Sequence, residues 1–331
     1  MSTTELALFS PDAQDSQGWI ARSKKWWVRF ASRCSGPSCP RLGKLWPAWV
    51  LKSSGTFFEG RWFCGRVCLE SALSSRVSAL LSTFQSEKPR VHRFPLGLLL
   101  INRGVISPPQ LREALRLQRE AGYGKLGDWL RRTADLNVQQ LTAALGQQWG
   151  CPVFPLEHQT AALGWGDLIP FSLLDSASAV PAHASPDGRS LHLAFEDRID
   201  HTLLFAIEQM LFCRTFPCVA PGSAVQAHLE QFRRLNSRTD TCFDTVRESQ
   251  EMIWTICNYA AELRASRVVL ARTGAFIWVR FFRNDIPRDL LFRITCDPTP
   301  ASAERSSFRS KVPSASADGR KGGIRDASLP L

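Results

Sequence analysis

Apolar residues recur along this chain at helical spacing, and between residues 95 and 148 one pattern occurs twice. Each copy reads Leu-Gly, an apolar patch, a turn-like middle and then Leu-x-x-x-Leu-x-x-Gln, and every recurring residue is displaced by 30 positions. The recurring pairs are Leu96 and Leu126, Gly97 and Gly127, Leu111 and Leu141, Leu115 and Leu145, and Gln118 and Gln148. A fixed offset of this kind indicates one supersecondary unit that is present in two copies.

Residues around these apolar positions mark the ends of predicted helices. Ser107 precedes Pro108-Pro109, which is a typical helix start, and predicts a helix over 110–118. Asn137 is the equivalent cap in the second copy, for a helix over 138–148. Shorter stretches at 98–102 and 129–132 predict one further helix in each copy, and Gly104 ends the first of these.

The segment before the repeat, residues 18–88, has a different pattern. A short amphipathic stretch among tryptophans is followed by strand-like runs at 46–52 and 56–63, which Ser53-Ser54-Gly55 joins. From Cys68 onward, apolar residues at positions 69, 73, 77, 80 or 81 and 84 have helical spacing. The pattern predicts a hairpin followed by a helix.

Two cysteine pairs, Cys34-x4-Cys39 and Cys64-x3-Cys68, flank the predicted hairpin. Four thiolates suit tetrahedral Zn²⁺, and cysteine pairs in a reducing compartment favour metal binding over disulfides. The arrangement resembles a treble-clef zinc finger, in which the second pair lies on the first turn of a helix. It predicts a structural zinc site; the alternative is four ordinary cysteines in a small domain.

Downstream of the repeat, residues 151–235 alternate between strand and helix patterns. Strands are predicted at 191–195 and 216–220, helices at 200–211 and 223–232, and a hairpin turn at 186–189. Such alternation argues for an open α/β sheet. The predicted fold class is therefore α+β and multi-domain: a small four-cysteine zinc module, then a helical tandem repeat joined to an open α/β sheet domain.

The repeat and the strands after it resemble the N-terminal domain of type II secretion and type IV pilus assembly ATPases. Some members bind cyclic di-GMP through two tandem copies of Arg-Leu-Gly-x-x, two apolar pairs and Leu-x3-Leu-x2-Gln, and the likeness covers about residues 94–235. It implies a cyclic di-GMP site in this chain. The residues implied are Leu96, Gly97, Leu111, Leu115, Gln118, Lys125, Leu126, Gly127, Asp128, Leu141, Leu145 and Gln148.

The chain departs from the family motif at both arginines, which are Pro95 and Lys125 here. Proline has no guanidinium group. Lysine keeps the positive charge but cannot form the bidentate hydrogen bonds of arginine. Asp128 can still accept a hydrogen bond from the edge of a guanine. Gln118 and Gln148 can still form hydrogen bonds with the guanine. The alternative is a repeat that keeps its packing leucines while the ligand site is lost.

The C-terminal segment predicts a helix over 246–263 and strands over 267–271 and 276–282, and it resembles the domain that precedes the motor in these ATPases. The chain lacks a Gly-x4-Gly-Lys-Ser/Thr loop, which would cradle nucleotide phosphates, so we expect no enzyme activity. The predicted parts are a disordered 1–17, the zinc module 18–88, the secretion-ATPase-like domain 92–235 (repeat 95–148, α/β part 151–235), a domain at 240–296 and a disordered tail 297–331.

Charge and hydropathy narrow the expected setting. The net charge is +11, and residues 1–90 hold 13 Lys and Arg against 6 Asp and Glu, interleaved with tryptophan. This composition leaves open a nucleic-acid-binding regulator. Because the sequence predicts neither a signal peptide nor a transmembrane segment, a cytoplasmic protein is expected. The leading hypothesis is a non-catalytic regulatory or adaptor protein that acts with a protein partner in a secretion or pilus system.

Overall fold

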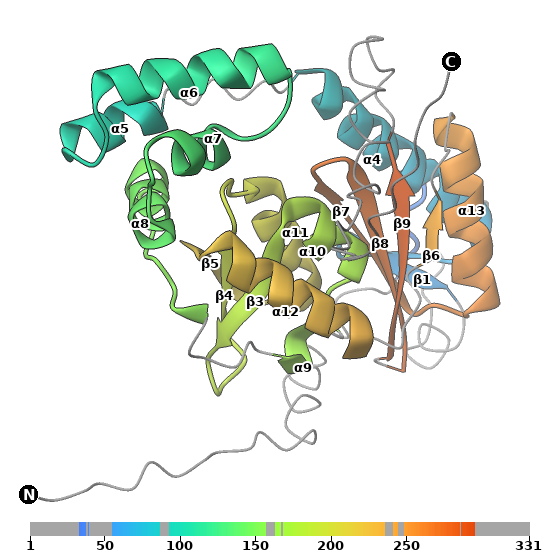
Figure 1. The fold of residues 1–331 in the computed structure, drawn as a ribbon. Coiled ribbons are helices and arrows are strands. Elements are labelled where there is room, and N and C mark those ends of the chain that lie inside the picture. Colours follow the sequence, from blue (N-terminus) through green and yellow to red (C-terminus); the bar gives the residue numbers. More distant parts are fainter. Residues whose placement is uncertain are drawn as a thin grey trace, which may run out of the picture. The chain divides into compact units, whose positions relative to one another are not determined.

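The computed structural model describes residues 33–37, 39, 55–86, 93–156, 163–166, 168–235, 241–243, 248–284 and 286–294. The predictions for segments 1–17, 46–52 and 297–331 and for the amphipathic stretch among tryptophans lie outside these residues. Within them the chain forms two mixed β-sheets and a set of helices (Figure 1). The predicted α+β class is confirmed.

The larger sheet is built from strands at both ends of the chain. A hairpin of β1 (Thr56–Phe58) and β2 (Arg61–Phe63) pairs in parallel with β7, so that Phe57 lies opposite Arg267. The strand order is β2-β1-β7-β8-β9-β6, with β6 at Thr241–Phe243, β7 at Arg267–Thr273, β8 at Phe276–Arg283 and β9 at Ile286–Arg293. Segments 18–88 and 240–296, which the sequence divides into separate domains, therefore share one sheet.

Two helices pack on one face of this sheet, α4 (Arg66–Ser86) and α13 (Ser249–Glu262) (Figure 1). Leu73 and Val77 of α4 are fully buried in the same core as Ile256 of α13 and Val279 and Phe292 of the strands. The two helices contact each other, and their apolar residues join one core with strands from both segments. The two segments therefore have a common core rather than one each.

Some strand boundaries differ from the predicted ones. The sequence predicts one strand over 56–63, whereas the chain turns back at Glu59-Gly60, whose φ angles are 47° and 75°. Strand β9 lacks a predicted counterpart because Pro287 and Asp289 interrupt its apolar pattern. Asp289 is nevertheless placed on an inner face, where it pairs with Arg280 of β8.

The second sheet has the order β3-β4-β5, with β3 antiparallel and β5 parallel to β4. The strands and the helices around them follow the order α10 (Phe171–Ala177), β3 (Ala179–Ala184), β4 (Ser190–Phe195), α11 (His201–Leu211), β5 (Arg214–Val219) and α12 (Gly222–Leu235). A short helix, α9 (Leu163–Gly166), precedes them. Asp200 caps α11 by accepting from the backbone N–H groups of Thr202 and Leu203. The observed alternation agrees with the predicted α/β pattern.

Helix α11 also packs against β7 of the larger sheet, and Phe276 and Trp278 belong to the same core as the smaller sheet. The turn after β7 is held by the Gly274 N–H, which donates to Thr202 Oγ1 at 2.7 Å. Arg280, which is 1% exposed, donates to Asp289 Oδ1 at 2.7 Å and to the backbone carbonyl of Leu168. A buried ion pair of this kind is costly to break, since the remaining charge is left without a partner.

Across the described ranges, no helix is both long enough and apolar enough to cross a membrane.

Candidate functional site

The tandem repeat folds as four helices, two from each copy. They are α5 (Leu96–Asn102), α6 (Pro108–Ala121), α7 (Leu126–Thr133) and α8 (Val138–Trp149). Ser107 and Asn137 cap α6 and α8, each within a capping box whose third helical residue is glutamine. Gly104 follows α5 with φ +66°. The predicted helix starts and the predicted stop are therefore confirmed.

The core of these helices repeats with the same 30-residue offset as the sequence. Its fully or nearly fully buried residues form three equivalent pairs, which are Leu100 and Leu130, Ile106 and Leu136, and Ala114 and Ala144. Both copies thus contribute the same positions to one shared core. Because each copy is too small to bury its apolar face alone, the second copy completes the first.

The glycines of the two motifs allow each first helix to approach its second helix closely. A Cβ on Gly97 would lie 2.6 Å from Leu111 Cδ1, and one on Gly127 would lie 2.9 Å from Leu141 Cδ2. Both distances are shorter than a normal van der Waals contact between carbon atoms. These motif glycines, and the leucines they meet, therefore have a packing role that does not depend on a ligand.

The glutamines that end the two motifs exchange hydrogen bonds between the copies. Gln118 of the first copy donates from Nε2 to the Gly124 carbonyl at 2.9 Å, and Gln148 of the second donates to the Phe94 carbonyl at 2.9 Å. Each acceptor directly precedes the motif start of the other copy. The exchange joins the end of each copy to the beginning of the other, which closes the four helices into a pseudo-twofold unit.

Lys125, at the start of the second motif, is held by two carboxylates from the loop after β4. Its Nζ lies 2.7 Å from Glu196 Oε1 and 3.0 Å from Asp197 Oδ2. Partial burial disfavours the ammonium charge, but the hydrogen bonds to these two acids outweigh it and raise the pKa of Lys125. Gln226 of α12 donates to the other oxygen of Glu196 at 3.0 Å. The charge expected to meet a ligand is thus already paired within the chain.

Near Pro95, an arginine that the sequence patterns did not single out takes a defined position. The guanidinium carbon of Arg93 lies 3.1 Å from the centroid of the Trp149 ring, and Trp149 Nε1 donates to the Asp197 carbonyl at 2.8 Å. Partial burial and the nearby charge of Arg198 lower the pKa of Arg93. A guanidinium therefore stands two residues before the position where the family motif has its first arginine.

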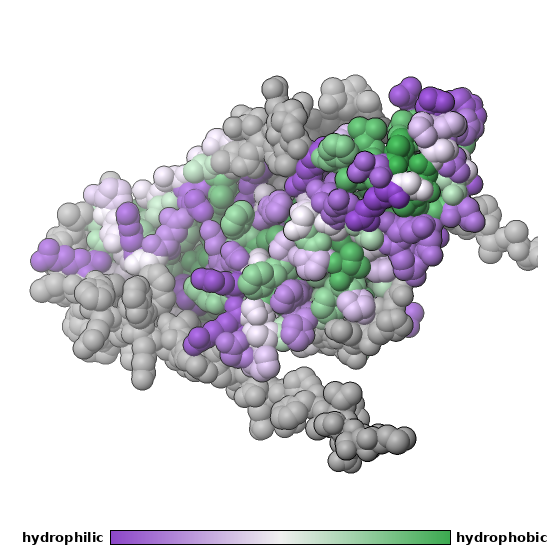
Figure 2. All heavy atoms as spheres, turned by 90° about the vertical axis from the view of Figure 1, so that its left-hand side faces the viewer, coloured by the Kyte–Doolittle hydropathy of each residue, from purple (hydrophilic) through white to green (hydrophobic). Residues whose placement is uncertain are grey.

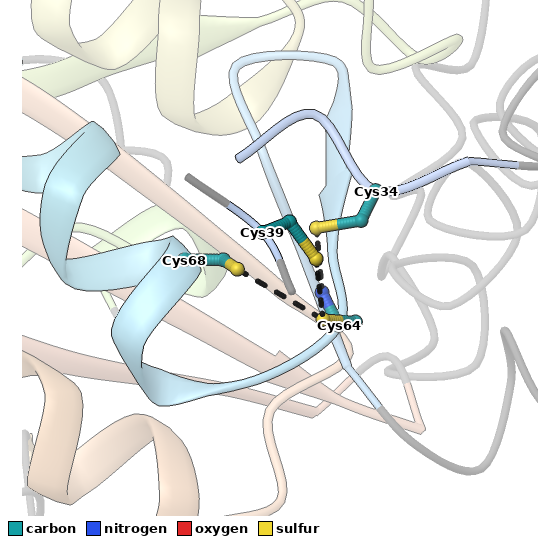
Figure 3. Close-up of side chains that lie close together, drawn as sticks. All are labelled: Cys34, Cys39, Cys64 and Cys68. Carbon is teal, nitrogen blue, oxygen red and sulfur yellow. Dashed lines mark hydrogen bonds between the residues drawn. The ribbon is translucent and has the colours of Figure 1, made fainter. Parts of the chain in front are cut away.

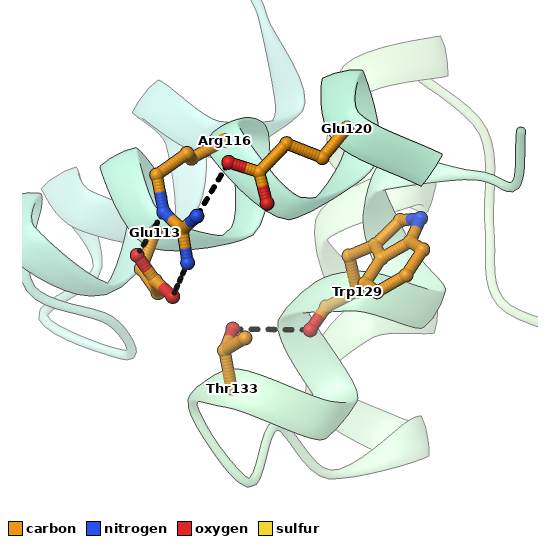
Figure 4. Close-up of polar contacts among 5 residues, drawn as sticks. All are labelled: Glu113, Arg116, Glu120, Trp129 and Thr133. Atoms are coloured by element: carbon orange, nitrogen blue, oxygen red, sulfur yellow. Dashed lines mark hydrogen bonds and ion pairs between the residues drawn. The ribbon is translucent and has the colours of Figure 1, made fainter. Parts of the chain in front are cut away.

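On the outer surface of the repeat, one arginine is paired with two carboxylates of its own helix. Arg116 of α6 bonds Glu113 through two nitrogens and also reaches Glu120, while Thr133 of α7 donates to the Trp129 carbonyl (Figure 4). Figure 2 shows apolar atoms (green) among hydrophilic ones (purple) on the side of the chain that carries α5–α8. Asp128 is exposed, and the motif leucines at positions 96, 111, 115, 126 and 141 are half-buried.

The four predicted zinc ligands come together from three elements. Cys34 and Cys39 lie on the arm before the hairpin, Cys64 follows β2, and Cys68 is on the first turn of α4 (Figure 3). All four sulfurs lie within 4.8 Å of one another, with Cys39 Sγ 3.6 Å and Cys68 Sγ 3.9 Å from Cys64 Sγ. Tetrahedral zinc with bonds of about 2.3 Å requires sulfur separations of about 3.8 Å. The cluster therefore has the size of a zinc site with four thiolate ligands.

Backbone groups around the cluster suit thiolate ligands. Cys34 Sγ accepts from the N–H groups of Gly36 at 3.5 Å and Cys64 at 3.4 Å, and a Cβ on Gly36 would lie 2.8 Å from Cys68 Sγ. Burial and the neighbouring sulfurs raise the pKa of Cys64 to about 11 and also raise that of Cys68. Four thiols so close together hold their protons unless a cation replaces them. The donor set fits a metal ion with no open position.

Of the comparisons with known proteins, the one with solved structures found similar chains. No protein-family model matches the chain, and a search of curated proteins found no match. Among solved structures it is similar to MshE with cdg (cyclic di-GMP), at 28% identity and TM-score 0.37, over 42% of this chain and 99% of that one. It is also similar to the N-terminal domain of XpsE in two crystal forms, at 16% and 18% identity and TM-scores 0.29 and 0.24, over 41% and 40% of this chain and 92% and 89% of those. The resemblance to secretion and pilus ATPase N-terminal domains is confirmed as a likeness over about 41% of the chain.

Proposed function

We propose that this chain is a non-catalytic regulatory or adaptor protein that binds cyclic di-GMP on its tandem repeat. The observation that carries the proposal is the exchange of glutamine bonds between the copies, because it builds a pseudo-twofold surface from the residues of the motif. Cyclic di-GMP is itself twofold, with two guanines and two phosphates. A twofold ligand matches a surface on which the leucines, the glycine and the glutamine of the motif occur twice, while Lys125 and Asp128 belong to the second copy alone.

The chemistry of the repeat supplies part of what the ligand needs. The half-buried leucines offer apolar floor for the sugars and bases, and exposed Asp128 can accept from the donor edge of a guanine. Gln118 and Gln148 use Nε2 for the backbone and retain their carbonyl oxygens as acceptors. The phosphates need cations, and Lys125 becomes available only when it leaves Glu196 and Asp197.

Calorimetric titration of the full chain with cyclic di-GMP tests this proposal. We expect the two copies of the repeat together to bind one ligand, and Asp128→Ala should weaken this binding. Because the Asp128 carboxylate is exposed, its loss should leave the core intact. Glu120→Ala on α6 removes an exposed carboxylate elsewhere on the repeat and should leave binding unchanged. Absence of heat at high micromolar ligand, with the chain folded by circular dichroism, refutes the binding proposal.

We also propose that the four cysteines hold a structural zinc ion. The sulfur separations and the N–H donors to Cys34 support it. Metal analysis of purified protein should find one zinc per chain, and Co²⁺ in its place should give the absorption bands of a four-thiolate site. A metal-free protein that retains its fold contradicts the proposal.

The proposed protein partner also rests on the family resemblance. We infer that the chain works in the cytoplasm with a component of a secretion or pilus system, because its repeat resembles the motif of the secretion and pilus ATPases. Capture from cells of the source organism with and without added cyclic di-GMP tests this inference. The nucleic-acid alternative stays a prediction, because most of the basic residues it depends on, among them Lys24 and Arg29, lie outside the described residues.

A further inference from the structure

Two histidines lie side by side on the smaller sheet, apart from the repeat and the cysteine cluster. His183 of β3 and His192 of β4 are register partners, with ring centroids 5.7 Å apart and ring planes at 51°. Phe216 of β5, the register partner of His192 on its other side, stacks on the His192 ring at 5.2 Å and 25°. His183 is exposed and His192 is half-buried, so solvent reaches the pair.

The separation of the rings suits a shared metal ion. Two imidazoles on one tetrahedral Zn²⁺ have ring centroids about 5.3 Å apart, since each Zn–N bond is about 2.0–2.1 Å long. The observed 5.7 Å differs from this value by a few tenths of an ångström, which small side-chain rotations can remove. Strand pairing fixes the two Cβ atoms, and the stacked Phe216 restricts the His192 ring. Little ordering is therefore needed when an ion binds.

A second observation also points to a ligand. Nδ1 of His192 is buried and, apart from a contact of the ring with the His183 backbone, has no hydrogen-bond partner among the residues that the structure describes. A buried nitrogen without a full hydrogen bond is unfavourable, so an arrangement that gives it a partner is favoured. Rotation of the ring by 180° exchanges Nδ1 with Cδ2, which lets His192 present either nitrogen beside His183.

We propose that His183 and His192 form a second metal site, which takes a divalent transition ion such as Zn²⁺, Ni²⁺ or Co²⁺. Imidazole nitrogen is a preferred ligand for these ions. Among the described residues the site has two protein ligands, so water completes the coordination and binding is weaker than at the four cysteines. The open positions distinguish this site from the closed cysteine cluster and allow exchange with ions in solution.

Titration of the zinc-loaded full chain with Ni²⁺ tests the proposal, because zinc already fills the cysteine cluster. Calorimetry should show one binding step for the wild-type chain and loss of that step in His183→Ala, which changes an exposed side chain. His228→Ala, on α12, is the matched control and should retain the step. His192→Ala should also lose it.

A second measurement is needed in case His192→Ala destabilises the smaller sheet. In the wild-type chain, Ni²⁺ should broaden the ring-proton signals of His183 and His192 before those of His228. The proposal is overturned if the wild-type chain shows no Ni²⁺ step, if His183→Ala binds Ni²⁺ as the wild type does, or if the two rings are not broadened first.

Discussion

The tandem repeat and the six-stranded sheet reach their cores in opposite ways. In the repeat, the buried residues of the shared core form pairs 30 positions apart, and the four helices follow one another along the chain. In the sheet, β1 pairs with β7, so that Phe57 meets Arg267 more than half the chain away. The first region can form from neighbouring segments, whereas the second requires both ends of the chain to meet.

The difference changes how the cysteine cluster is understood. The hairpin between the cysteine pairs is not an independent zinc finger, because its strand β1 pairs with β7 and α4 shares a core with α13. A metal ion at the cluster therefore holds the arm before the hairpin to a sheet whose other strands lie near the C-terminal end of the described chain. We expect the metal to support the larger sheet but not the repeat.

The largest expected effect is that of removing the metal. Structural zinc contributes about 10–16 kcal/mol of apparent binding free energy at neutral pH, and much of this is folding free energy. Chelation, or Cys39→Ser, should lower the melting temperature of the larger sheet and expose the amides of β7 to hydrogen exchange. Cys151→Ser, half-buried and outside the cluster, is the control. Equal protection of β7 with and without metal contradicts the shared-sheet account.

Equivalent core substitutions in the repeat come next. Leu100→Ala and Leu130→Ala each remove a fully buried side chain and should each cost about 2–5 kcal/mol of unfolding free energy. Because the two leucines occupy matching places, their costs should be similar and should not change when the metal is removed. Urea unfolding followed by helical circular dichroism measures both. Clearly unequal costs would show that the copies are not energetically equivalent.

A smaller effect is expected for the exchanged glutamine bonds. Gln118→Ala and Gln148→Ala should each cost about 0.5–1.5 kcal/mol, the net value of one hydrogen bond. Gln147→Ala changes an exposed neighbour on the same helix and should cost less than about 0.5 kcal/mol. If Gln147→Ala costs as much as Gln148→Ala, the exchange does not close the pseudo-twofold unit.

The smallest effect on stability is expected at Lys125. Its ion pairs are partly exposed, so Glu196→Gln should change the unfolding free energy by less than about 1 kcal/mol. The same substitution leaves Lys125 paired with Asp197 alone and should tighten cyclic di-GMP binding, if the ligand phosphate competes with the two acids for Lys125. Calorimetric titration of the variant measures the change. Weaker binding by Glu196→Gln would mean that Glu196 itself serves the ligand.

Much of the repeat could be predicted from the sequence. The helix starts at Ser107 and Asn137 and the stop at Gly104 rest on local chemistry, which acts between residues a few positions apart. The four candidate zinc ligands could also be predicted, because the two cysteine pairs have sequence spacings typical of metal ligands. In contrast, Arg93 belongs to no motif and acquires its position only by packing on Trp149.

The sequence by itself determined the copies, their helices and the residues able to hold a metal, since periodicity and capping are properties of short segments. Only the tertiary structure decided that the hairpin joins the C-terminal strands, that Gln118 and Gln148 bond the opposite copy, and that Lys125 is paired with Glu196, 71 residues later. The reason is physical. Strand pairing and ion pairs depend on which segments meet after the chain folds, and apolar periodicity carries no information about that meeting.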